Sequence, residues 1–259
     1  MTTEVLFEQQ GPIGRITFSQ PKGINILSTT VLAALEARLD EIARRPEIRV
    51  LVITGSGKTF VAGADISEMA NAPRDTGQSF SRRGHAAMDK IANMEQVVTI
   101  AAINGPTMGG GCELACACDL RVMANEAKIG VPEVKLGLIP GWGGTQRLRL
   151  LLGPGGARRL VFTGEALDGQ AALRIGLVNM AVPAAELMAT VDALAKQIIA
   201  NGPTAVRMAK RALLAMDKIW LEKGLLAEAE GFGEAFRHPE SSEGLKAFLE
   251  KRPPAWQKS

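Results

Sequence analysis

Two continuous apolar runs, rich in β-branched residues and each closed by glycine, constrain the fold of this chain most strongly. They are VLVITG at 50–55 and VVTIAAING at 97–105. Runs of this kind are typical of strands that are buried on both faces of a parallel sheet. Apolar residues spaced three and four apart predict helices over 31–42 and 79–94, before and between these strands. The alternation of strands and helices predicts an α/β core.

Shorter patterns flank these elements. Two strands are expected at 4–9 and 13–18, joined by a turn at Gly11-Pro12. A helix is expected at 110–118, and the apolar run LRVMA at 120–124 predicts a further strand directly after it. The core therefore continues at least as far as this last strand.

Helical patterns take over from about residue 143. They cover 143–152, 155–162, 168–175, 184–200, 203–216, 218–237 and 240–250. The sequence Asn201-Gly202-Pro203 interrupts them. We therefore expect a core over 1–195 and a helical C-terminal region over 196–259.

Glycine is unusually frequent, with 28 in 259 residues, about 11% against an average near 7%. It gathers in or beside three segments, FVAGADI at 60–66, NGPTMGGGCELACACD at 104–119 and IGVPEVKLGLIPGWGGTQRL at 129–148. In the second segment, glycines 109–111 open the predicted helix, whose first N–H groups have no partner within the helix. An oxygen that gains negative charge can approach such groups closely. A phosphate-binding loop is the alternative, but the Lys-Ser/Thr ending of that motif is missing.

Two glutamates accompany these glycines. Glu113 lies in the first turn of the predicted helix, where its simplest role is to interact with the helix dipole. Glu133 follows a proline among apolar residues, a costly place for a carboxylate unless it is paired or used. A solvated glutamate in a turn is the alternative for Glu133. Each residue alone thus has a structural as well as a catalytic interpretation.

The composition argues against several other classes of protein. The 30 Lys+Arg and 27 Asp+Glu leave a net charge of only +3, which gives no basic footprint for nucleic acid. No apolar run reaches the 18 or so residues of a spanning helix, and the N-terminus has no apolar signal region. We expect a soluble, cytoplasmic protein. Its clustered Cys112, Cys116 and Cys118 are expected to be small buried side chains rather than disulfide or metal ligands, so no metal site is predicted.

Three further polar residues have structural interpretations. His85 and His238 stand in polar stretches of predicted helices, and we expect both to lie on the surface. Asp119 ends the predicted helix 110–118, where a hydrogen bond or an ion pair is favoured over catalysis.

GADI after a strand, GGGCEL at a helix start and PEVKLGLIPGWGGTQRL, in this order, resemble the enoyl-CoA hydratase/isomerase (crotonase) superfamily. The resemblance extends from PKGINIL at 21–27 to FLEKR at 248–252. It implies a crotonase-like spiral of ββα units with a helical C-terminal region, assembled as homotrimers or as hexamers. Because Glu113 and Glu133 are both present, the chain most resembles true enoyl-CoA hydratases, which add water to 2-trans-enoyl-CoA.

The resemblance also implies roles for individual residues. The backbone N–H groups of Ala64 and Gly110 would form an oxyanion hole for the thioester carbonyl. Glu133 would exchange a proton at Cα while Glu113 holds the water, or both would act on that water in one step. Coenzyme A is part of the substrate, and no separate cofactor is expected. The residues that would contact coenzyme A are Lys22, Ala62, Asp65, Ile66, Phe232, Phe248 and, across a subunit boundary, Lys251.

Trp142 stands where many relatives carry a smaller residue. It is expected either to line the acyl pocket or to point outward.

Other functions stay open at this point. A related enzyme of the superfamily would shift a double bond, decarboxylate or hydrolyse a CoA ester, although such relatives often lack one of the two glutamates. A catalytically silent subunit of a larger assembly is a further alternative. RNA binding would use the basic stretch RMAKRALL at 207–214, but cations spaced on a helix more often form a solvated face. An acyl-CoA substrate is therefore the favoured partner.

Overall fold

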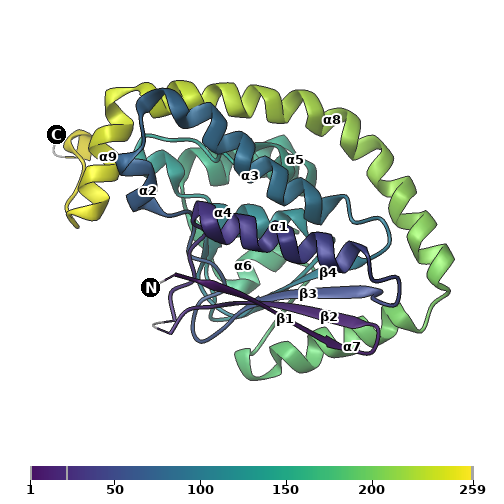
Figure 1. Cartoon of the computed structure of the whole chain (residues 1–259). Helices are drawn as coiled ribbons and strands as arrows, with labels where there is room; N and C mark the ends of the chain where they lie inside the picture. Colours follow the sequence, from purple (N-terminus) through teal and green to yellow (C-terminus); the bar gives the residue numbers. More distant parts are fainter. Residues whose placement is uncertain (1, 22, 258–259) are drawn as a thin grey trace.

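A twisted sheet forms the centre of the protein (Figure 1). The computed structural model describes residues 2–21 and 23–257, and in this part of the chain six strands form the main sheet in the order β1-β2-β3-β4-β6-β9. The β1–β2 pair is antiparallel and the other neighbours are parallel. The strands are β1 (Glu4–Gln10), β2 (Ile13–Ser19), β3 (Val50–Gly55), β4 (Val98–Ile103), β6 (Leu120–Ala124) and β9 (Met180–Val182).

A smaller sheet lies beside it, with the strand order β5-β7-β8. Its strands are β5 (Thr107–Met108), β7 (Ile129–Gly130) and β8 (Ala166–Leu167). The pairing of β5 with β7 is parallel and that of β7 with β8 is antiparallel. Because β5 ends at the residue before Gly109, this sheet fixes the start of the glycine-rich helix.

Helices cover the main sheet, with α1 and α3 on one side and α7 on the other (Figure 1). The helices are α1 (Thr29–Ala43), α2 (Ile66–Asn71), α3 (Gly77–Ala92), α4 (Gly110–Ala117), α5 (Gly144–Thr163), α6 (Gly169–Arg174), α7 (Leu187–Ile199), α8 (Pro203–Arg237) and α9 (Pro239–Leu249). Short 3₁₀ turns cover Arg74–Thr76, Glu133–Leu136, Ala184–Glu186 and Ala255–Gln257.

Local chemistry accounts for the boundaries of these elements. The side chain of Ser28 caps α1 by accepting from the Val31 N–H group at 3.3 Å. Helix α5 is interrupted at Gly153, which has φ 68 and is followed by Pro154, so the expected division between 152 and 155 is confirmed. Strand β3 has no exposed side chain, as expected of a central parallel strand, and α7 packs against it.

The expected α/β core is confirmed, but the C-terminal half differs in two ways. The helices predicted at 203–216 and 218–237 are a single helix, α8, since the sequence from 214 to 220 contains neither glycine nor proline to stop it. Strands β8 and β9 lie within the part predicted as helical. They hold two and three residues, too few to produce a periodic pattern.

Helix α8 arches over α3 and α5 (Figure 1) and is tied to the core by a buried ion pair. The Lys210 ammonium lies 2.7 Å from Asp119 Oδ2 and donates to the Val97 carbonyl at 2.7 Å. Asp119 also accepts from the N–H and the hydroxyl of Thr99 at 2.7 and 2.9 Å. The structural interpretation of Asp119 is confirmed, whereas the idea that all cations of 207–214 face solvent is wrong for Lys210.

The proposed division of the chain into 1–195 and 196–259 stays a prediction. Among the described residues, none of the helices combines the length and the apolarity that crossing a bilayer requires.

The Asp119–Lys210 pair leads to a stability prediction. Asp119→Ala leaves the buried ammonium with one carbonyl acceptor and removes the acceptor of the Thr99 N–H group. We expect a loss of about 1–3 kcal/mol in the free energy of unfolding, measured in urea. Lys210→Met should cost less because Asp119 keeps both hydrogen bonds from Thr99. Equal losses, or a larger loss for Lys210→Met, would contradict this assignment.

Candidate active site

The glycine-rich segments at 60–66 and 104–111 lie side by side. A bridge pairs Val61 with Thr107, and the Met108 N–H group donates to the Val61 carbonyl at 3.1 Å. A Cβ atom at Gly111 would lie 2.0 Å from that carbonyl oxygen, so only glycine permits this approach. Gly63 contributes a left-handed turn, with φ 126.

This arrangement leaves two backbone amides free. Neither the Ala64 nor the Gly110 N–H group donates to another residue within 2–21 and 23–257. Gly110 is the first residue of α4, where helix geometry supplies no acceptor. Both residues line one cavity, which can therefore receive an oxygen that carries developing negative charge.

Glu113 lies in the first turn of α4 and is 2% exposed. Its Oε1 accepts from the N–H groups of Trp142 and Gly144 at 2.7 and 2.8 Å. Burial, followed by the charges of Glu133 and Glu228, raises the pKa of Glu113 well above its usual value, although the two N–H donors act in the opposite direction. The dipole interaction alone thus does not describe this residue, which also lines the cavity.

Glu133 begins the 3₁₀ turn that follows Pro132 and is half-buried. A Cβ atom at Gly109 would come within 2.9 Å of its Oε1, which places this carboxyl at the N-terminus of α4. Its Oε2 is buried and has no hydrogen-bond partner among the described residues. Burial, together with the charge of Glu228, raises the pKa of Glu133 to about 8. An unpartnered buried carboxyl oxygen requires an explanation, and a bound water or substrate would supply one.

The cavity has a volume of about 290 Å³. It brings together most of the residues that the sequence singled out, namely Ala62, Ala64, Ile66, Gly110, Glu113, Glu133, Trp142, Phe232 and Phe248. Asp65 instead caps α2, accepting from the Ser67 and Glu68 N–H groups at 2.9 and 3.3 Å. Lys251 is exposed beyond α9 and does not line the cavity, and Lys22 falls outside the described residues.

The indole of Trp142 points inward, with 2% exposure, so the outward orientation is excluded. Its ring lies 5.4 Å from that of Phe80 between centroids. A Cβ atom at Gly84 or at Gly110 would come within 2.0 or 2.5 Å of the indole. A valine at position 110 would thus strike Trp142, so such a variant would disturb the cavity wall as well as the amide.

Apolar residues that the sequence analysis missed complete the wall. They are Met69, Phe80, Met108, Leu136 and Leu138. They come from α2, α3, β5 and the segment after Glu133, and nothing in the sequence distinguishes them from ordinary core residues.

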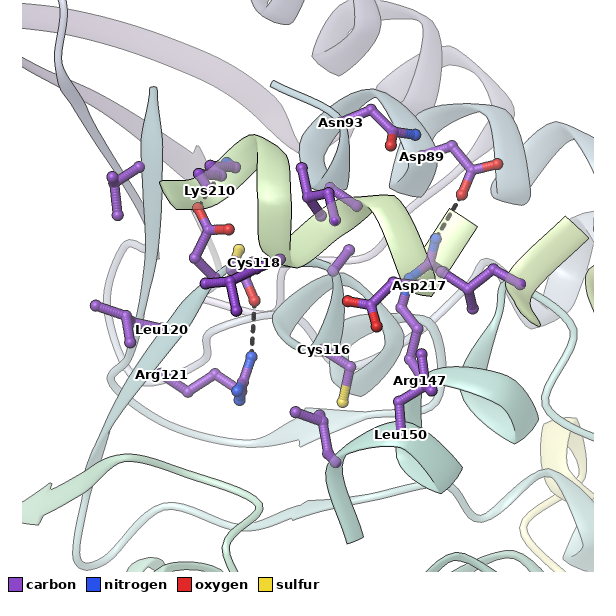
Figure 2. A pocket seen from close by; sticks show the side chains of 18 of the residues that line it. Asp89, Asn93, Cys116, Cys118, Leu120, Arg121, Arg147, Leu150, Lys210 and Asp217 are labelled. Carbon is purple, nitrogen blue, oxygen red and sulfur yellow. Dashed lines mark hydrogen bonds and ion pairs between the residues drawn. The ribbon is translucent and has the colours of Figure 1, made fainter. Parts of the chain in front are cut away.

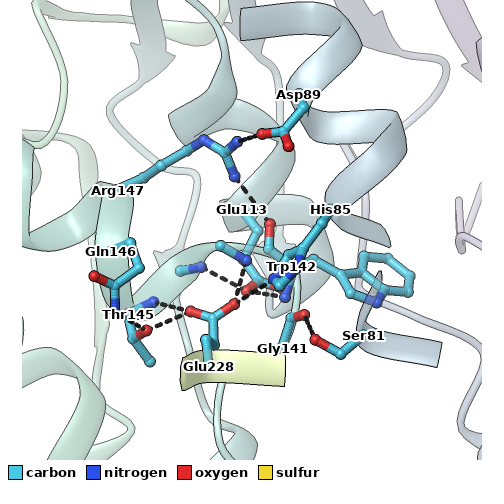
Figure 3. A network of polar contacts seen from close by, with 12 residues as sticks. Ser81, His85, Asp89, Glu113, Gly141, Trp142, Thr145, Gln146, Arg147 and Glu228 are labelled. Atoms are coloured by element: carbon cyan, nitrogen blue, oxygen red, sulfur yellow. Dashed lines mark hydrogen bonds and ion pairs between the residues drawn. The ribbon is translucent and has the colours of Figure 1, made fainter. Parts of the chain in front are cut away.

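His85 is buried rather than on the surface as expected (Figure 3). It is 7% exposed, and its Nε2 lies 2.9 Å from Oε1 of Glu228 on α8. The polar stretch around His85 could not reveal that α8 covers this side of α3. Glu228 was also missed, because the sequence LLAEAEGF does not distinguish it from the exposed Glu230. His238 is exposed, as expected.

The three cysteines are buried free thiols, as expected. Among the described residues, no cluster of His, Cys, Asp and Glu has the arrangement of a metal site.

A second, larger cavity of about 750 Å³ lies between α8 and the ends of α4 and α5 (Figure 2). Cations on its wall already have partners: Arg147 pairs with Asp89 at 2.5 Å, and Lys210 with Asp119. None of the described residues predicted for the site lines it. The smaller cavity contains the two free amides and the carboxyl groups of Glu113 and Glu133. It is therefore the candidate active site.

The fold and the cavity, with its two free amides and two glutamates, agree with comparisons to known proteins. The chain belongs to the enoyl-CoA hydratase/isomerase family, whose model matches residues 8–259. It is 40% identical over 249 residues to the short-chain-enoyl-CoA hydratase of Clostridium acetobutylicum and to the crotonyl-CoA hydratase of Syntrophomonas wolfei, covering 96% of this chain and 95% of each relative.

A crystal structure of an enoyl-CoA hydratase from Bacillus anthracis is similar over 98% of both chains, with a TM-score of 0.79 and 36% identity. The expected crotonase-like fold is thereby confirmed.

The raised pKa of Glu133 predicts a pH-dependent effect on stability. The folded protein retains this proton up to about pH 8, whereas the unfolded chain releases it near 4.5. Stability therefore falls as the pH rises between these values. Glu133→Gln should remove this loss, so its melting temperature should gain more over wild type at pH 8 than at pH 4.5. An equal difference at both pH values, or one no larger than in Glu230→Gln, would contradict the assignment.

Proposed function

We propose that this protein is an enoyl-CoA hydratase that adds water to short 2-trans-enoyl-CoA thioesters, giving 3-hydroxyacyl-CoA. The observation that carries the proposal is that two free amides, the buried Glu113 and the half-buried Glu133 line a single small cavity. The names of the two relatives above, hydratases of short-chain enoyl-CoA and of crotonyl-CoA, support the same reaction. The presence of both glutamates favours hydration over the isomerase, decarboxylase and hydrolase alternatives.

In this proposal the thioester carbonyl oxygen lies between the N–H groups of Ala64 and Gly110. These donors withdraw electron density from the conjugated double bond, which makes Cβ electrophilic. They also stabilise the enolate-like charge that appears on the oxygen when water attacks. Because both donors belong to the backbone, little reorganisation is needed during the reaction.

The two glutamates then divide the proton transfers. Glu113, as a carboxylate, takes a proton from water while the water oxygen forms a bond to Cβ. The electrons of the double bond move toward the thioester, and protonated Glu133 supplies the proton that forms the new C–H bond at Cα. Glu113 ends protonated and Glu133 ionised, and one proton exchange restores the pair. Carboxyls with raised pKa suit this work near neutral pH.

Trp142 sets the acyl length in this proposal. The cavity volume, about 290 Å³, lies at the lower end of the range of roughly 300–1,000 Å³ for small-molecule sites. The buried indole packs against Gly84, Gly110 and Phe80. We therefore assign short acyl groups as substrates.

The coenzyme A part would extend from the cavity mouth, where Phe248 is 56% exposed. The stretch from Ala62 through Asp65 to Ile66, with Phe232, would meet the adenine and pantetheine. Lys22 and, from a second subunit, Lys251 would meet the phosphates. We propose that the reaction needs no separate cofactor, because coenzyme A belongs to the substrate.

We also propose a homotrimer, alone or paired into a hexamer, with 196–259 as the association region. Large apolar side chains exposed on α8 support it, with Leu213 at 75%, Ile219 at 65% and Trp220 at 60% exposure. A cytoplasmic location is proposed because the three cysteines are free thiols.

Removing either carboxyl tests the chemistry. We expect Glu113→Gln and Glu133→Gln each to lower turnover of crotonyl-CoA by about 100-fold or more, the lower end of a general acid–base contribution. Binding of a CoA ester, measured by calorimetry, should persist. Glu230→Gln, the same change on an exposed face of α8, is the control. Near-normal turnover in either active-site variant would refute the two-carboxylate mechanism.

Replacing Trp142 tests the acyl-length assignment. Trp142→Leu should raise kcat/KM for an eight-carbon relative to a four-carbon enoyl-CoA by roughly tenfold or more, because each methylene accommodated in an apolar pocket changes discrimination by at least this factor. Trp220→Leu, at an exposed position on α8, serves as the matched control. The same chain-length ratio in both variants would contradict the role of Trp142.

A further inference from the structure

Four successive N–H groups at the start of α5 alternate between two buried carboxylates (Figure 3). The first and third, of Trp142 and Gly144, donate to Oε1 of Glu113 at 2.7 and 2.8 Å. The second and fourth, of Gly143 and Thr145, donate to Oε1 and Oε2 of Glu228 at 2.5 and 2.9 Å. The turn 142–145 is thus held between α4 on one side and α8 on the other.

Glu228 is fully buried, and its partners account for the position of its carboxylate. Its side chain is 0% exposed. Besides the two N–H groups it accepts from the hydroxyl of Thr145, and His85 Nε2 lies 2.9 Å from its Oε1. A carboxylate removed from water is stable only with such a set of donors. The turn and α3 therefore form a site built for this carboxylate.

Two carbonyl groups of the same turn also accept hydrogen bonds from side chains. Ser81 Oγ donates to the Gly141 carbonyl at 2.5 Å, and Arg147 Nη1 donates to the Trp142 carbonyl at 3.1 Å. Gly143 has φ 100, a conformation that other residues rarely adopt. A turn of this shape needs contacts on both sides, and Glu228 provides those that oppose Glu113.

We infer that Glu228 is a positioning residue for hydration: with His85 and Thr145 it fixes the turn whose N–H groups orient the Glu113 carboxylate. This inference rests on the proposed function. Glu228 does not line the cavity, and it acts only through the turn and through its charge.

Replacing Glu228 should therefore change two measurable quantities. Glu113 would lose its fixed position, which should lower kcat, because a displacement of about 1 Å at the reacting groups can reduce the rate 100-fold. The loss of charge should lower the pKa values of Glu113 and Glu133, since the Glu228 carboxylate raises both. The other titratable groups facing Glu228 and the turn are His85 and the Arg147–Asp89 pair. The pH profile of kcat should therefore move to lower pH.

The experiment compares Glu228→Gln with Glu230→Gln, wild type being assayed in parallel on crotonyl-CoA. Glutamine keeps the size of Glu228 but places an NH₂ group where an acceptor is needed. We expect kcat to fall by about 10- to 100-fold, with a smaller change in KM and a pH profile shifted to lower pH. Glu230→Gln should match wild type in all three quantities.

A milder pair of variants covers the case in which Glu228→Gln does not fold. Thr145→Val removes the hydroxyl that donates to Glu228 but keeps the N–H group. We expect it to lower kcat by about 2- to 10-fold, the effect of one hydrogen bond. Thr145→Ser retains the hydroxyl and should restore the wild-type rate.

The outcomes separate the inference from the proposed function. A wild-type protein without turnover of crotonyl-CoA would refute the proposed function itself. With an active wild type, the positioning role is overturned if Glu228→Gln matches Glu230→Gln in kcat and pH profile. It is also overturned if Glu228→Gln lowers only the melting temperature, or if Thr145→Val and Thr145→Ser have equal rates.

Discussion

The turn that begins α5 is the constraint on which the rest of the candidate site depends. It must offer N–H groups to Glu113 from α4 and to Glu228 from α8 at the same time. A Cβ atom at Gly144 would come within 2.8 Å of Glu113 Oε1, and Gly143 has a positive φ. The approach of Glu113 therefore explains Gly144, and the positive φ of the turn explains Gly143.

Burial gives Glu113 and Glu133 their proposed chemistry. In water a carboxyl group is ionised at neutral pH and has no proton to donate to carbon. Enclosure beside Trp142, together with neighbouring negative charge, raises the pKa of both Glu113 and Glu133. The free amides of Ala64 and Gly110 face the same cavity, so stabilisation of the oxyanion and a source of protons are combined in one small volume.

Features that depend on neighbouring residues in the sequence were predicted well. Strands β3 and β4 and helix α4 followed from apolar runs and glycines, and motif positions gave the residues that meet in the cavity. Features that depend on distant packing were not predicted. The contact between His85 and Glu228 joins residues 143 positions apart, and only the path of α8 brings them together. Strands β5 and β7–β9 are too short to leave a pattern.

Hydration near neutral pH requires the pair formed by Glu113 and Glu133 to retain at least one proton. Infrared difference spectra between wild type and the two glutamine variants measure this directly, because protonated and ionised carboxyls absorb at different frequencies. At pH 7 we expect a protonated carboxyl band in wild type that is lost in Glu133→Gln and persists in Glu113→Gln. Two ionised carboxylates at pH 7, each titrating near its usual value of 4.5, would contradict it.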